Sequence, residues 1–127
     1  MAFDWADYLV FAEELAQRSD EAALRSAMSR AYYAAFCTAR NRLRQDHPYF
    51  EKERQALDSH KRVWDVYRND THEPRHSIGE VGDRLRKKRR LADYEDEVRG
   101  LPKLARDTTA KARRLLDWLD SLGNAGP

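Results

Sequence analysis

The sequence predicts an all-α protein, a bundle of five antiparallel helices that pairs into a dimer. Apolar residues recur at three- and four-residue spacing along most of the 127-residue chain, and no stretch shows the alternation typical of a strand. The connections between these stretches are short, so neighbouring helices should pack antiparallel. A chain of this length can bury one core, and we predict a single domain over residues 1–123 with a frayed tail over 124–127.

The first two helices are predicted over residues 4–17 and from Asp20 to just before Pro48. Ser19 should be the N-cap of the second helix, whose first turn carries Asp20 and Glu21 where the helix dipole favours negative charge. Pro48 should end it, because the residue before a proline is pushed out of the α region. The second helix is the longest and should be the centre of the bundle. Its inward face is Leu24, Ala27, Met28, Ala31, Tyr32, Ala35, Phe36, Ala39 and Leu43.

The third helix is predicted over residues 50–68 and has a narrower apolar face. Trp64 and Tyr67 lie on that face, and His60 falls on the same stripe. Residues 69–74 are rich in turn-forming side chains and should form a loop.

The last two helices are indicated by capping and breaking residues. Ser77 and Glu80 have the spacing of a capping box, which should open the fourth helix. Residues 92–100 form a polar break that should turn at its final glycine. Pro102 suits the first turn of the fifth helix, and Gly123 should close it.

The distribution of apolar residues indicates in which cellular compartment the protein is expected. No stretch has the 18 apolar residues of a membrane span, and the first residues lack the layout of a signal peptide, so we expect a cytoplasmic protein without a membrane partner. Cys37 is the only cysteine and should be buried. Trp118 and Tyr33 fall off the main apolar stripes, which favours further burial against a second copy; the alternative is that both rings lie flat on the surface.

Positive charge is concentrated in one segment although the formal net charge is only +2. Six of the seven residues from Arg84 to Arg90 are cationic, and four acidic residues follow within 93–97. Such a run either contacts phosphate groups or pairs with acids on neighbouring elements. Phosphate contact is favoured because the adjacent acids are too few to cover six cations.

Familiar enzyme motifs are scarce. The chain has no Gly-rich phosphate loop and no cysteine cluster, and we expect no cofactor. Residues 72–76 match the zinc-protease pattern HExxH, which requires both histidines on one face of a helix. Pro74 disfavours that helix, so a polar loop without metal is the preferred interpretation.

Two motifs resemble the HEPN domain family, in particular a small prokaryotic group first catalogued as uncharacterised. Residues 29–36 have the sequence SRAYYAAF, and residues 89–94 match the pattern Arg-x-x-Ala-Asp-Tyr. His60 falls where members of that group often have a histidine. The resemblance extends over residues 4–122.

This resemblance implies a dimeric helical bundle, often encoded with a minimal nucleotidyltransferase as a toxin and antitoxin pair. Many HEPN proteins are metal-independent ribonucleases with an Arg-x(4–6)-His motif. The arginine and histidine would polarise the phosphate and move protons, so that the ribose 2'-OH attacks.

The sequence departs from that ribonuclease motif. At the family's usual place, Arg68 and His72 are separated by three residues, one too few. Formal matches occur elsewhere, as expected by chance in a chain with this many arginines, so they carry little information. They are Arg54 to His60, Arg42 to His47 and Arg40 to His47.

A different polar cluster is therefore the candidate site, with residues from the second helix, the third helix and the segment after the fourth. The alternative is structural: Asp93 pairs with Arg30 or Arg89, and Tyr94 caps the bundle. On the functional interpretation, the catalytic residues are His60, Arg89 and Asp93, and the RNA- or nucleotide-binding residues are Arg30, Tyr94, Arg86, Lys87 and Arg90.

The expected function is that of a HEPN-type component of a toxin and antitoxin or defence module that binds or cleaves RNA. The alternative is a non-catalytic helical adaptor that docks a nucleotidyltransferase partner through its basic helix.

Overall fold

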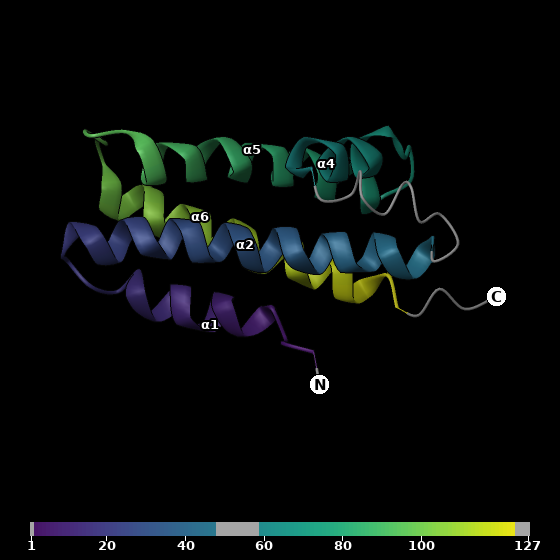
Figure 1. The fold of residues 1–127 in the computed structure, drawn as a ribbon, viewed down its shortest axis with the longest axis horizontal. Helices are drawn as coiled ribbons and strands as arrows, with labels where there is room; N and C mark the ends of the chain where they lie inside the picture. Colours follow the sequence, from purple (N-terminus) through teal and green to yellow (C-terminus); the bar gives the residue numbers. More distant parts are fainter. Residues whose placement is uncertain (1, 48–58, 124–127) are drawn as a thin grey trace.

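The structure is a computed structural model that describes residues 2–47 and 59–123. The described residues form helices and connecting segments without any strand, which confirms the predicted all-α class (Figure 1). The helices are α1 (Ala6–Leu15), α2 (Glu21–Asp46), α4 (His60–Asn69), α5 (Arg75–Tyr94) and α6 (Leu101–Ser121).

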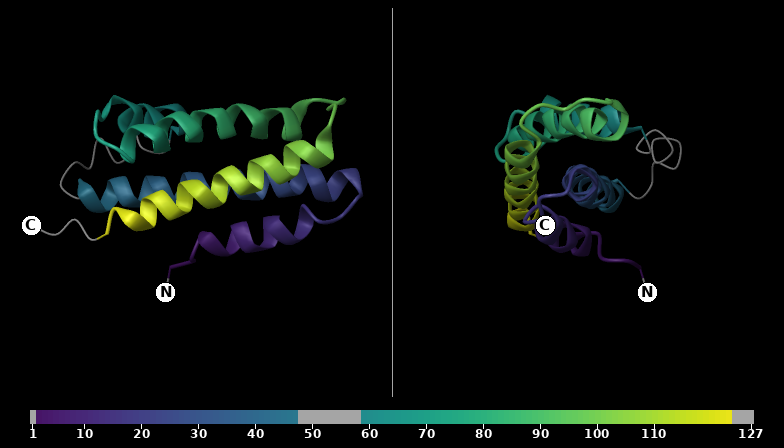
Figure 2. Two further views of the ribbon diagram at one scale, coloured as in Figure 1. Left: turned by 180° about the vertical axis from the view of Figure 1, so that it is seen from behind. Right: turned by 90° about the vertical axis from the view of Figure 1, so that its left-hand side faces the viewer.

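The long helix α2 lies at the centre of the bundle, as predicted. Figure 1 shows α1 on one side of α2 and the α4–α5 pair on the other. Seen from behind in Figure 2, α6 runs along α2 between these two outer layers. Each of the other four helices packs against α2. The outer layers are therefore held together through α2 and α6.

Small and aromatic side chains on α2 make this packing possible. Ala31 and Ala35 are fully buried and let neighbouring helices approach closely, while Tyr32 and Phe36 fill the space between them. A second, smaller cluster lies at the other end of the bundle, where α5 meets α6. Its members are Ala16, Leu24, Ala27, Met28, Ala92, Leu101 and Ala105.

Two glycines on α5 allow an especially close approach of α4. A β-carbon at Gly79 would lie 2.3 Å from the backbone nitrogen of Arg68, and one at Gly82 would lie 2.1 Å from the ring of Trp64. Higher positions on α5 thus meet lower positions on α4, so the two helices form an antiparallel pair. This pair fixes where α4 begins, at His60.

Helix starts differ from the sequence prediction. Ser19 is not the N-cap of α2; Asp20 occupies that position, and its carboxylate accepts a hydrogen bond from Arg18 instead of capping the helix. The capping box at Ser77 and Glu80 is also wrong, because α5 already begins at Arg75. There the Glu73 carboxylate accepts a hydrogen bond from the backbone N–H of Ser77. A side chain that precedes the helix thus provides an acceptor for an amide of its first turn.

Helix ends are predicted more closely, with one exception. Gly100 before α6 and Gly123 after it adopt left-handed conformations with φ of 66° and 64°, as expected of glycines at helix boundaries. However, α5 continues to Tyr94, so the polar break starts later than predicted. The predicted helix portion over 50–58 lies outside the described residues.

The off-stripe aromatic rings have partners within the chain. Trp118 lies under the guanidinium of Arg114, and Tyr33 contacts Tyr32 and His60. Their placement therefore does not require a second copy, and the dimer stays a prediction. None of the described helices is long and apolar enough to cross a bilayer.

Candidate functional site

The candidate site lies where the first residue of α4 meets the aromatic face of α2. The His60 imidazole stacks on the Phe36 ring with centroids 4.0 Å apart, and on the Tyr32 ring at 5.5 Å. The ring of Tyr33 meets it edge-on. His60 is half-buried in this position.

A chain of hydrogen bonds fixes the orientation of this imidazole. Trp64 Nε1 can only donate, and it donates to the Tyr32 hydroxyl oxygen at 3.0 Å. The Tyr32 hydroxyl lies 2.8 Å from Nδ1 of His60. In neutral His60, Nδ1 accepts the hydroxyl hydrogen and the ring proton sits on Nε2.

The surroundings of His60 favour that neutral form. Burial lowers the pKa of His60, and the positive charges of Arg89, Arg86 and Arg40 lower it further. The three arginines come from two helices, α2 and α5. The site therefore combines an uncharged imidazole with concentrated positive charge.

Arg89 connects α5 to the aromatic face of α2. Its guanidinium lies over the rings of Tyr32 and Tyr33, at 5.3 and 5.5 Å from their centroids. It also pairs with Asp93 at 3.3 Å, and the hydroxyl of Ser29 donates to the same carboxylate. Its buried Nε has no acceptor among the described residues. Arg89 is thus positioned by packing as much as by its ion pair.

Asp83 is the central acid of the basic helix. Its carboxylate is buried and pairs with Arg86 at 2.9 Å, Lys87 at 3.3 Å and Arg68 at 3.5 Å. Burial disfavours the charged form, but the hydrogen bonds from Arg86 and Lys87 outweigh it and lower the pKa of Asp83. Asp83 therefore stays ionised and links α4 to α5.

Acids on the same helix accompany most of the basic run. Four of its six cations have such a partner: Arg84 lies 3.9 Å from Glu80, two cations contact Asp83, and Arg89 contacts Asp93. Three of these four cations pair with Glu80 or Asp83, which precede the run, so the acids that follow it are not its main partners. Lys87 nevertheless keeps 67% of its side-chain surface exposed. The outward side of α5 therefore remains open to an anionic partner.

The structure brings only part of the predicted cluster together. His60 and Arg89 meet at the ring of Tyr32, and Asp93 joins them through Arg89, while the charge of Arg86 also lowers the pKa of His60. Arg30 instead stacks on the Tyr8 ring of α1, away from this group. Arg89, Asp93 and Tyr94 lie on α5 rather than on a segment after it.

The structural alternative is also right only in part. Asp93 pairs with Arg89, not with Arg30. Tyr94 does not cap the bundle, since 72% of its surface is exposed.

Comparisons with protein-family models, with curated proteins and with solved structures find no match to this chain. The HEPN resemblance therefore rests on the two sequence motifs, and it stays a prediction.

Three contributors to the site were missed from sequence. Arg40 lies over the Phe36 ring, while Tyr33 and Ser29 contact Arg89 and Asp93. The spacing of Ser29, Tyr33 and Arg40 along α2 follows the face that meets α4 and α5. That spacing was readable in the sequence, but nothing in the sequence told which helix this face would meet.

The histidines of the HExxH match contact different groups. His72 lies in the loop, 3.1 Å from the Asp70 carboxylate, and His76 lies on α5 with Nδ1 2.7 Å from the carbonyl oxygen of Arg68. The described residues contain no group of three His, Cys, Asp or Glu side chains that could hold a metal ion.

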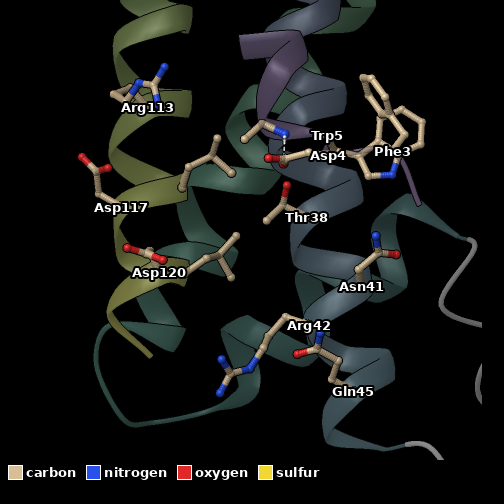
Figure 3. A pocket seen from close by; sticks show the side chains of 13 residues that line it. Phe3, Asp4, Trp5, Thr38, Asn41, Arg42, Gln45, Arg113, Asp117 and Asp120 are labelled. Atoms are coloured by element: carbon tan, nitrogen blue, oxygen red, sulfur yellow. Dashed lines mark hydrogen bonds between the residues drawn. The ribbon is translucent and has the colours of Figure 1, made fainter. Parts of the chain in front are cut away.

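A separate groove lies between the N-terminal segment, α2 and α6 (Figure 3). Asp117 and Asp120 lie on its α6 wall, and Thr38 and Asn41 on its α2 wall. Arg113, on the α6 wall, pairs with Glu13 of α1. The groove is thus on a different face of α2 from Phe36, on which His60 stacks.

Proposed function

We propose that this protein is a HEPN-type component of a toxin and antitoxin or defence module, and that it binds RNA where α2, α4 and α5 meet. One observation carries the proposal: the half-buried His60 stacks on Phe36, and the guanidinium groups of Arg40 and Arg89 lie over the aromatic rings that His60 contacts. Positive charge concentrated near a half-buried imidazole is suited to a phosphate group.

The outward side of α5 would extend the contact along the RNA backbone. Lys88 and Arg90 are exposed, and Lys87 is largely so. Backbone contacts of this kind fix position but do not read sequence, and they release counterions. RNA binding should therefore be weakly sequence-dependent and should fall steeply with salt concentration.

The hydrogen bonding of His60 favours binding over cleavage. A general base needs a free lone pair, but Nδ1 of neutral His60 accepts the Tyr32 hydroxyl hydrogen and Nε2 carries the ring proton. The nearby arginines also disfavour the imidazolium that would act as a general acid. His60 is best suited to donate a hydrogen bond from Nε2 to a phosphate oxygen.

The experiment that tests this function measures binding and cleavage together. Purified protein is titrated into a mixed, labelled RNA pool with chelator present, and free, bound and cleaved RNA are separated. We expect salt-dependent RNA binding by the wild type. Binding should weaken about tenfold or more in Arg89→Ala, because a charge-assisted contact is lost. His60→Ala should weaken binding too.

Arg114→Ala is the matched control, because this guanidinium also lies over an aromatic ring, that of Trp118 on α6. It should bind RNA as the wild type does. If all three variants bind RNA as tightly as the wild type, RNA does not bind at His60. Metal-independent cleavage that disappears in His60→Ala would replace the binding role with a catalytic one.

A non-catalytic adaptor is the second candidate, and the pairing of α5 cations with acids on their own helix favours it. Charged groups arranged in this way also serve at protein interfaces, where complementary charges on the partner orient it. A nucleotidyltransferase partner would then dock on Arg86, Lys87 and Arg90. Reversing these three to glutamate should abolish binding of the co-expressed partner in the absence of RNA; unchanged affinity would remove the basic helix from that interface.

A further inference from the structure

The groove between the N-terminal segment, α2 and α6 is large enough to hold a small ligand (Figure 3). Its volume is about 520 Å³, within the range of roughly 300–1,000 Å³ that small-molecule sites occupy. Leu116 and Leu119 of α6 provide apolar surface in the groove. Thr38 and Gln45 of α2 also line it, and within the described part of the chain neither side chain has a hydrogen-bond partner. A ligand would therefore meet both apolar surface and free polar groups.

The arginines that line the groove are already engaged by acids. Arg42 pairs with Asp46, one turn further along α2, at 3.2 Å, and it also donates to the carbonyl oxygen of Gly123. Arg113 pairs with Glu13 of α1. An anionic ligand would have to compete with these acids for the guanidinium groups. The groove is therefore poorly suited to an anion.

Three carboxylates of the groove, in contrast, have no ion pair among the residues that the structure describes. They are Asp4, Asp117 and Asp120. Asp4 accepts a hydrogen bond from the backbone N–H of Ala6 at 3.0 Å, which fixes it at the start of α1. Asp117 and Asp120 lie one turn apart on the α6 wall. The charge of the groove that no partner balances is therefore negative.

The end of α6 contributes further negative potential to the groove. The C-terminal end of a helix is the negative end of its dipole, where cations are stabilised and carboxylates are disfavoured. Asp120 nevertheless lies in the last turn of α6, and no basic residue accompanies it there. Arg42 reaches the Gly123 carbonyl just beyond this turn, but its charge is shared with Asp46. A bound cation would relieve this unfavourable placement.

An extended organic cation fits this arrangement better than a metal ion does. The described residues contain no group of three acidic, histidine or cysteine side chains that could hold a metal. The β-carbons of Asp117 and Asp120 are about 5–6 Å apart, as expected for one helical turn, and Asp4 belongs to the N-terminal segment across the groove. Trp5, next to Asp4, adds an aromatic ring of the kind that attracts ammonium groups. The negative charge is thus spread along the groove.

We propose that this groove binds a linear aliphatic polyamine. Such a molecule carries several ammonium groups along an alkyl chain, so its charges can meet the three carboxylates while the chain lies along Leu116 and Leu119. The groove is on a different face of α2 from Phe36, on which His60 stacks. Polyamine binding is therefore separate from the proposed RNA contact, and the two proposals can fail independently.

Isothermal titration calorimetry with spermidine tests the proposal on the full chain, in metal-free buffer without RNA. The wild type should bind spermidine at a single site, and the affinity should fall as salt concentration rises. Asp117→Asn with Asp120→Asn keeps the shape of both side chains but removes their charges, so binding should weaken about tenfold or more. Because a carboxylate is disfavoured at the end of α6, this double variant should unfold at a temperature no lower than the wild type does.

Two further variants separate the groove from general electrostatic attraction. Glu97→Gln with Asp107→Asn is the matched control: it causes the same change in net charge with two exposed acids outside the groove, and it should bind spermidine as the wild type does. Gln45→Lys places a competing cation in the groove and should weaken binding. Magnesium at equal ionic strength should not displace spermidine, since the groove offers no set of metal ligands.

Several outcomes would overturn the proposal. A wild type that does not bind spermidine is one, and equal binding by the groove double variant and its matched control is another. Displacement of spermidine by magnesium would replace the polyamine with a divalent metal ion. Arg89→Ala should bind spermidine as the wild type does, because Arg89 does not line the groove. Loss of spermidine binding in that variant would move the polyamine to the face of α2 that His60 contacts.

Discussion

Gly82 on α5 lies directly against the indole of Trp64 on α4, and a β-carbon at this position would be 2.1 Å from a ring carbon. No real β-carbon approaches another heavy atom so closely. Trp64 is fully buried and also donates to Tyr32, so its ring cannot simply turn away. The absence of a side chain at Gly82 therefore lets α4 pack on α5 and holds the start of α4 in place.

Gly82→Ala should destabilise the fold. In an ordinary helix this change is stabilising, because alanine has the higher helix propensity. Here the added methyl group overfills the contact with Trp64, and we expect the free energy of unfolding to fall by about 1–3 kcal/mol. Urea unfolding followed by circular dichroism measures the change.

A second substitution checks that the clash with Trp64 is the cause. The three atoms nearest a β-carbon at Gly82 all belong to the indole of Trp64, and the smaller phenylalanine ring would leave more space beside this position. Gly82→Ala should therefore cost less in a Trp64→Phe background than in the wild type. An equal cost in both backgrounds, or a gain in stability, would contradict this account.

Arg89→Gln should raise the pKa of His60. Burial is the largest cause of the lowered pKa and would remain, but the positive charge with the largest effect on it would be gone. The pKa should therefore move toward, without reaching, the ordinary value of 6.5. A histidine NMR titration measures it, with Arg114→Gln as the control. If the pKa of His60 does not change in Arg89→Gln, the charge of Arg89 does not affect His60.

The stability of the protein should depend on pH through His60. Its pKa in the folded state lies below its value in the unfolded chain, so the unfolded chain takes up the proton first as pH falls. The contribution is complete above pH 6.5 and is lost as pH falls from there toward the folded pKa. Urea unfolding at several pH values in this window should show a smaller decline for His60→Gln than for the wild type.

Asp83→Asn should change stability and RNA binding in opposite directions. Loss of the buried carboxylate leaves three cations without their shared acid, and unfolding should become easier by about 1–3 kcal/mol. Under the proposed function the released Arg86 and Lys87 should bind RNA more tightly. Lys87→Gln is the comparison, since it removes a cation without burying an uncompensated charge. Weaker RNA binding by Asp83→Asn would show that Asp83 positions these cations.

The sequence predicted the helices better than their contacts. Apolar spacing predicted each of the described helices, because burial of one face follows the helical period. Caps were less reliable: Ser77 lies inside α5, since Arg75 and His76 can also be helical once Glu73 reaches the Ser77 amide. Local patterns cannot decide between two caps when tertiary packing shifts a helix start by one turn.

The candidate site was predicted only in outline. His60 and Arg89 do meet, but this requires the close α4–α5 approach at Gly79 and Gly82, which no periodic pattern reveals. Arg30 was grouped with them because it shares the motif of residues 29–36, although it points to Tyr8 instead. A motif indicates which residues matter, and only packing decides which of them touch.

The burial of Cys37 has a practical consequence for every experiment above. Burial raises the pKa of its thiol, so little of the reactive thiolate is present near neutral pH. Maleimide dyes should thus spare Cys37 in the folded protein. In the variant Lys103→Cys the exposed new thiol would then carry the label alone, and this variant can be followed by fluorescence without first replacing Cys37.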